Sequence, residues 1–183
     1  MSLSAEALRT ELFQRLDQAQ VHHDLYIALR SCVSKPGNVM KLNRNIRFFA
    51  GVESALFNST VVVLYALHET RKDTVNLYRL LDALEPLTPP ARLEEYRDRM
   101  ARMKPLWRRV GVIRNEMVGH QSLELYADPA KTRAKLAIRE VDELLAETRR
   151  MISDISSTEF DVGIAVMQGT RSSVDRLLSR ING

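Results

Sequence analysis

Apolar residues recur every three or four positions along most of the chain, and this spacing constrains the fold more than any other feature. The first long stripe consists of Leu8, Leu12, Leu16, Ala19, His23 and Tyr26. Such spacing places side chains on one face of an α-helix, and no stretch shows the two-residue alternation of a strand. Only seven glycines and six prolines interrupt 183 residues. The sequence therefore predicts an all-α bundle of about five to six helices, forming a single domain over residues 1–183.

Capping and breaking residues predict where the helices begin and end. The expected helices cover residues 5–33, 43–70, 73–84, 91–118 and 128–156, with a short last helix after Thr170. Ser4 and either Asp73 or Thr74 are the expected N-caps of the first and third helices. The start of the fifth helix is open between Asp128 and Ile138. The second helix is apolar on all faces, which predicts a buried position at the centre of a bundle or of a dimer.

The composition indicates a soluble protein of a reducing compartment. Cys32 is the single cysteine, so no intramolecular disulfide forms. The longest apolar run, Val61 to Leu67, has seven residues, whereas a membrane span needs about 20. The N-terminus has no basic segment followed by an apolar one, so no signal peptide is expected. We therefore predict a cytoplasmic location and no membrane partner.

The positive charge is concentrated in one segment. The formal net charge is +4, and residues 91–120 alone hold eight Lys/Arg against four Asp/Glu. A local basic patch is typical of a surface that binds phosphate or RNA, although a solvated arginine-rich helix face has the same composition. Lys104, Arg108 and Arg109 are the candidates for contacting an RNA backbone, whereas Trp107 is expected in the core.

Arg114 interrupts the apolar stripe of this basic segment. Leu93, Tyr96, Met100, Met103, Trp107 and Val110 precede it at helical spacing, and Met117 follows. An inward-pointing arginine needs an anion, either a carboxylate of another helix or a bound phosphate. Asn115 and His120 follow within six residues. Histidine can move a proton near neutral pH, arginine can hold a phosphate, and the Asn115 amide can orient the histidine or bind the phosphate.

The other histidines do not form a recognisable metal site. In His22-His23-Asp24 the adjacent residues point about 100° apart on a helix and cannot easily face one ion. His23 lies on the apolar stripe and is expected to be hydrogen-bonded in the core or at an interface. His68 is expected to be structural. We predict no metal site.

With Arg114, Asn115, four intervening residues and His120, the sequence resembles the HEPN superfamily of helical bundles. Its motif has arginine, a polar residue, four to six further residues and histidine, often with a small residue such as Gly119 before the histidine. The long apolar helix and the segment after Asp73 resemble the abortive-infection branch of that superfamily. The resemblance covers about residues 45–155.

The resemblance implies a metal-independent endoribonuclease of toxin or antiphage-defence type. Arg114, Asn115 and His120 would be its catalytic residues, no cofactor would be needed, and RNA and a cognate antitoxin would be its partners. It also implies a homodimer. Residues six apart on an ideal helix differ by about 120° and roughly 9 Å of rise. Arg114 and His120 of one chain therefore need not meet, and a two-fold axis would unite two copies of the motif.

Two other functions remain open from the sequence. In the first, the protein is a non-catalytic helical dimer that binds nucleotide, RNA or a partner protein. In the second, it is purely structural: Arg114 forms a buried ion pair and His120 caps a helix end. No glycine-rich phosphate loop, nucleophile-elbow motif or paired-cysteine site points to another enzyme class.

Overall fold

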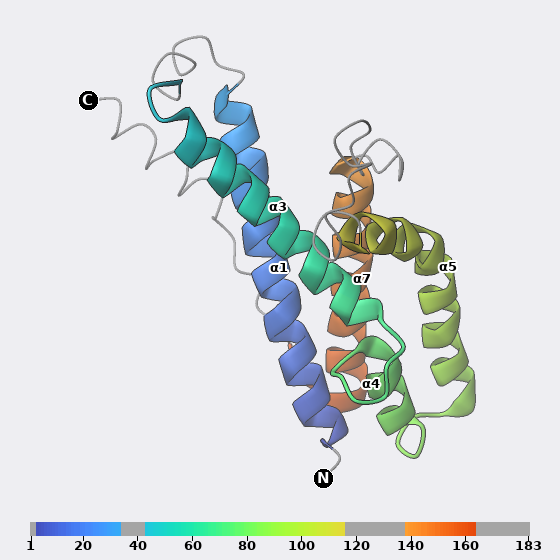
Figure 1. Ribbon diagram of the computed structural model, residues 1–183. Helices are drawn as coiled ribbons and strands as arrows, with labels where there is room; N and C mark the ends of the chain where they lie inside the picture. The colour runs from blue at the N-terminus through green and yellow to red at the C-terminus, as the bar shows by residue number, and fades with distance from the viewer. Residues whose placement is uncertain (1–2, 34–42, 116–137, 164–183) are drawn as a thin grey trace.

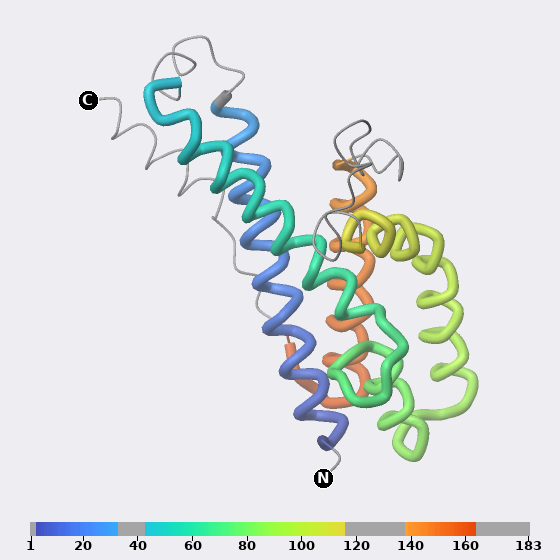
Figure 2. The backbone as a smooth tube through the Cα atoms, in the orientation of Figure 1, coloured from blue at the N-terminus to red at the C-terminus, as the bar shows by residue number. Residues whose placement is uncertain are grey.

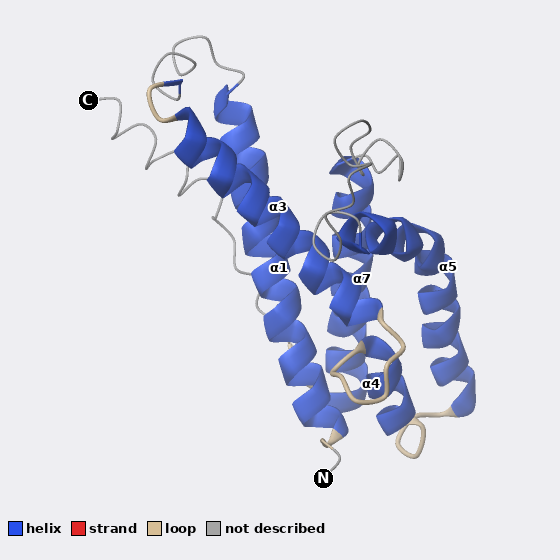
Figure 3. Cartoon of the chain, in the orientation of Figure 1, coloured by secondary structure: helices blue, strands red, loops and turns tan. Residues whose placement is uncertain are grey.

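The chain folds as a bundle of helices. The computed structural model describes residues 3–33, 43–115 and 138–163, and these contain helices and loops without a strand (Figures 1 and 3). The helices are α1 (Ala5–Val33), α3 (Ile46–His68), α4 (Leu77–Leu84), α5 (Pro90–Arg114) and α7 (Ile138–Phe160). The prediction of an all-α fold is confirmed. The region expected to contain the start of the fifth helix, and the helix after Thr170, lie outside the described residues.

Side-chain caps fix where two of the helices begin. Ser4 accepts a hydrogen bond from the backbone N–H of Ala7 (3.2 Å), as predicted. The predicted cap of the third helix is wrong. Asn76, not Asp73 or Thr74, accepts from the backbone N–H of Arg79 at 3.0 Å. Asn76 is fully buried, and its amide also donates to the Arg71 carbonyl (2.7 Å). The same side chain therefore caps the helix and holds the preceding loop against it.

The long helices α1 and α3 run antiparallel and lie side by side, and α7 also packs against α1 (Figure 1). The core of the bundle is formed by buried side chains from all five described helices. Its fully buried aliphatic residues include Leu12, Leu16, Leu64, Leu67, Leu80, Val110, Leu144 and Ile152. Burying each such side chain contributes about 1.5–3 kcal/mol. The apolar stripe of the first predicted helix is thus confirmed as a core face.

Within a single chain, the prediction that the second helix is buried on all sides at the centre of a bundle holds only for its second half; burial in a dimer stays a prediction. Ile46 is 59% exposed and Phe48 is 66% exposed, whereas Leu64 and Leu67 near the other end are fully buried. Among the described helices, the first half of α3 packs mainly on α1, which covers one side of it (Figure 1). By length and composition α3 is a candidate membrane span, with a mean hydropathy of 1.4, but its second half forms part of the bundle core.

Helix α5 changes direction along its length, and its later turns cross towards α3 (Figure 2). Pro105 lies inside this helix. Proline lacks a backbone N–H and its ring clashes with the preceding turn, so a helix bends there. The bend directs the basic end of α5, which carries Arg114, onto the second half of α3.

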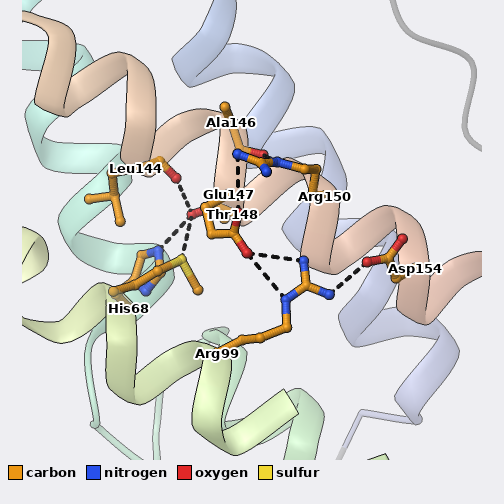
Figure 4. A network of polar contacts seen from close by, with 9 residues as sticks. His68, Arg99, Leu144, Ala146, Glu147, Thr148, Arg150 and Asp154 are labelled. Carbon is orange, nitrogen blue, oxygen red and sulfur yellow. Dashed lines mark hydrogen bonds and ion pairs between the residues drawn. The ribbon is translucent and has the colours of Figure 1, made fainter. Parts of the chain in front are cut away.

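Two buried histidines connect α7 to the rest of the bundle. His23 of α1 lies 2.8 Å through Nε2 from Oδ1 of Asp142. Nε2 of His68 lies 2.8 Å from the hydroxyl of Thr148 (Figure 4). Since that hydroxyl donates to the Leu144 carbonyl at 2.7 Å, it accepts from His68, which places the proton of the ring on Nε2. Both histidines are structural, as predicted.

Removing the Asn76 cap should destabilise the fold more than removing the Ser4 cap. We expect Asn76→Ala to cost about 2 kcal/mol, because a helix cap and a buried loop hydrogen bond are lost together. The exposed cap at Ser4 should cost about 0.5–1 kcal/mol when Ser4→Ala is tested in the same way. Urea unfolding of both variants measures the difference, and equal costs would contradict the assignment of Asn76.

His68 should make the stability of the fold depend on pH. Burial lowers the pKa of His68 from 6.5 to about 4. The neutral ring therefore contributes stability that is fully present above pH 6.5 and is lost as the pH falls towards 4. The free energy of unfolding should fall by about 1.4 kcal/mol per pH unit across this interval from His68 alone.

His68→Gln is the matched control, since its amide can donate to Thr148 and does not titrate. The difference in free energy of unfolding between the wild type and this variant should shrink by roughly 3 kcal/mol between pH 7 and pH 4. Parallel pH profiles would show that His68 is not the group responsible.

Candidate functional site

Arg114 is the last residue of α5 and is half-buried. Its guanidinium carbon lies 5.2 Å from the centroid of the Tyr65 ring, in the position of a cation–π contact. Its Nη1 donates a hydrogen bond to Oδ1 of Asn115 (3.0 Å). Among the described residues it forms no ion pair with a carboxylate. Arg114 therefore has only partly the inward orientation predicted from the apolar stripe. Its guanidinium lies on an aromatic ring and is not paired with a carboxylate of any described residue.

Asn115 follows at the C-cap of α5 and is exposed. Its backbone N–H still bonds to the carbonyls of Gly111 and Val112, so the residue continues the helical turn of Arg114. The two neighbouring side chains are joined by the hydrogen bond between them. Together they present one cationic and one neutral polar group at the end of α5. His120, the third member of the predicted motif, lies outside the described residues.

Tyr65 is a site residue that the sequence analysis did not single out. It packs against three residues of α5: its ring is stacked on Trp107 (centroids 5.7 Å apart), lies beneath Arg114 and faces Gly111. A Cβ atom at Gly111 would lie 3.1 Å from Cε2 of Tyr65. Nε1 of Trp107 donates to the Tyr65 carbonyl (3.3 Å). Trp107 is only partly buried and packs on Tyr65 rather than in the core, where it was expected.

The three cations predicted to contact RNA are not equivalent. Lys104 and Arg108 are exposed and form no ion pair with any residue in the described parts of the chain. They are four residues apart, so they share one face of α5. Arg109 points to α7, where it is paired with Glu140. Its charge is compensated, which leaves Lys104 and Arg108 better suited to bind a phosphate.

A pocket of about 350 Å³ lies between α5 and α7. Its lining includes Arg99, Arg102, Glu143, Glu147 and Arg150. Arg99 bridges Glu147 (3.2 Å) and Asp154 (2.6 Å), as Figure 4 shows. Burial lowers the pKa of Arg99 and the two carboxylates raise it, with a net increase. Because opposite charges compensate each other here, the pocket is an ion-pair network between helices rather than an anion site.

The described residues contain no group of three or more His, Cys, Asp or Glu side chains arranged to hold a metal ion. The polar groups gathered at the end of α5 are instead a guanidinium and an amide. These bind anions, and phosphate oxygens above all, through N–H donors.

Comparison with known proteins identifies the family. The family model described as AbiU2, a HEPN family, matches residues 3–159. No curated protein and no solved structure matches the chain. The match spans all five described helices and includes the segment from Arg114 to His120. The chain therefore belongs to the HEPN superfamily, in its abortive-infection-type AbiU2 family.

Proposed function

We propose that this protein is a metal-independent endoribonuclease of the toxin or antiphage-defence type. The observation that carries the proposal is the state of Arg114. In the HEPN motif of this chain, its guanidinium lies on an aromatic ring beside Asn115 and is not neutralised by a carboxylate of any described residue. A guanidinium in this state retains its charge for a phosphate. Membership of an abortive-infection-type family agrees with a role in defence.

The proposed reaction is cleavage of RNA by its own 2′-hydroxyl. The 2′-oxygen attacks the adjacent phosphorus while its proton passes to a general base. The bond from phosphorus to the 5′-oxygen breaks, and that oxygen takes a proton from a general acid. The products are a 2′,3′-cyclic phosphate and a 5′-hydroxyl end, so no water and no redox partner is consumed.

Each motif residue has a role in this reaction. His120 exchanges protons as base or acid, since histidine titrates near neutral pH. Arg114 binds the non-bridging oxygens and stabilises the charge that develops on the phosphate. Asn115 orients Arg114 through their hydrogen bond. Two copies of the motif across a homodimer would supply one histidine as base and another as acid.

RNA cleavage in the presence of EDTA tests this function. The wild type should cleave labelled RNA and leave cyclic phosphate ends. Arg114→Ala and His120→Ala should each lower the rate by at least about a hundredfold, because phosphate stabilisation and proton transfer typically contribute that much. The matched control is Arg97→Ala, which removes an exposed charge from the start of the same helix and should leave the rate unchanged.

Two different outcomes would contradict the proposed ribonuclease function. Equal cleavage by the wild type and His120→Ala would indicate a contaminating nuclease and reject the motif assignment. RNA binding by folded wild type without any cleavage would favour the alternative of a non-catalytic HEPN-type dimer.

The salt dependence of RNA binding tests the basic face of α5. For single-stranded RNA, each neutralised phosphate contributes about 0.7 to the slope of log K against log salt concentration. Lys104→Ala and Arg108→Ala should each reduce the slope by about this amount. Arg109→Ala should leave it unchanged, because Arg109 is already paired with Glu140. An equal reduction in all three variants would show that the pairing does not distinguish them.

A further inference from the structure

We propose that Tyr65 of α3 is a positioning residue for Arg114: its ring holds the guanidinium in place while leaving the charge available for the scissile phosphate. The inference rests on the proposed function for the identity of the phosphate. The contact between the two side chains is a separate claim, and it can be tested without catalysis.

The geometry of the ring contact supports this role. The guanidinium carbon of Arg114 lies 5.2 Å from the Tyr65 ring centroid. A cation is attracted to the face of an aromatic ring through the ring quadrupole, and this attraction neutralises no charge. The N–H donors of the guanidinium bond to acceptors at its edges, and among the described residues Asn115 is the one acceptor that they reach. No other described residue occupies the remaining donors, which can bind an anion.

Two other arginines of α5 are held in a different way. Arg99 is paired with Glu147 and Asp154, and Arg109 is paired with Glu140. Carboxylates fix the position of these side chains but also satisfy their donors and compensate their charge. A phosphate would have to displace a carboxylate before it could bind. Arg114 is held by an aromatic ring and avoids this competition.

One face of α5 packs against the ring of Tyr65. Trp107, Gly111 and Arg114 recur at the four- and three-residue spacing of one helix face, and all three contact Tyr65. Trp107 stacks on the ring and donates to the backbone carbonyl of the same residue. A side chain at position 111 would crowd the ring, with its Cβ 3.1 Å from Cε2. The lack of a side chain at Gly111 thus lets Tyr65 lie close enough to α5 to reach Arg114.

The first test is spectroscopic and uses the wild-type protein. The side-chain protons of Arg114 should resonate upfield of those of an exposed arginine, because the ring current of Tyr65 shields them. Tyr65→Phe should retain this shift and Tyr65→Leu should abolish it. Tyr78→Leu is the matched control, since Tyr78 is also partly buried against the core but lies on α4. An unshifted Arg114 in the wild type, or a shift that survives Tyr65→Leu, would overturn the inference.

The second test separates positioning from general stability. Tyr65→Leu should lower kcat for RNA cleavage about tenfold, equivalent to about 1.4 kcal/mol of transition-state stabilisation, with little change in KM. Tyr65→Phe should restore the wild-type rate. In an Arg114→Ala background, Tyr65→Leu should cause no further loss, because a residue that acts through Arg114 has nothing left to position.

The same loss in both backgrounds would show that Tyr65 acts independently of Arg114 and would overturn the inference. If the folded wild type cleaves no RNA at all, the proposed function fails. In that case the chemical shifts of the Arg114 side-chain protons alone test whether Tyr65 holds Arg114.

Discussion

The candidate site depends on the packing of the last turns of α5 against Tyr65 of α3. Pro105 bends α5, and the bend brings Trp107, Gly111 and Arg114 onto the same aromatic ring. Without this contact, the end of the helix would carry a solvated arginine with many rotamers. Ordering a long arginine side chain costs up to about 2 kcal/mol of conformational entropy. In this structure packing contributes that order, so a bound phosphate need not provide all of it.

The distribution of carboxylates divides the arginines of α5 into two kinds. Arg99 and Arg109 are held by acidic residues of α7 and fix the packing of the two helices. Arg114, as well as Arg108 on the exposed face, has no such partner among the described residues. The excess positive charge of residues 91–120 is therefore not spread evenly over the helix. It is compensated where α5 meets α7, whereas Lys104, Arg108 and Arg114 have no carboxylate partner among the described residues.

Much of the fold could be predicted from the sequence because helical periodicity is a local property. The apolar stripe of α1 and the buried positions of α5 follow directly from the spacing of residues such as Leu12 and Met100. The cap at Asn76 could not be identified, because three polar residues lie close together and only burial in the folded chain selects one of them. The exposure of Phe48 was missed for a similar reason: composition shows that a helix is apolar but not how much of it neighbouring helices cover.

Only the part of the candidate site that lies on α5 could be predicted from the sequence. Arg114 and Asn115 stand out because a charged residue interrupts an apolar stripe. Tyr65 does not, since it lies inside the longest apolar run, where an aromatic residue is ordinary. The close approach of Gly111 to Tyr65 could not be predicted either, because a glycine within a helix can also mark a bend. The contact between Tyr65 and Gly111 exists only in the folded chain, where α3 packs on α5.

The proposed reaction is cleavage of RNA through the 2′-hydroxyl of the substrate, with residues of the chain and no metal. The most direct measurement compares one RNA oligonucleotide with the same sequence methylated at every 2′-oxygen, both incubated in EDTA, with the product ends identified by mass spectrometry. Cleavage of the unmodified RNA alone, with 2′,3′-cyclic phosphate and 5′-hydroxyl ends, is the predicted result. Cleavage of the methylated RNA, or activity that EDTA abolishes, would contradict it.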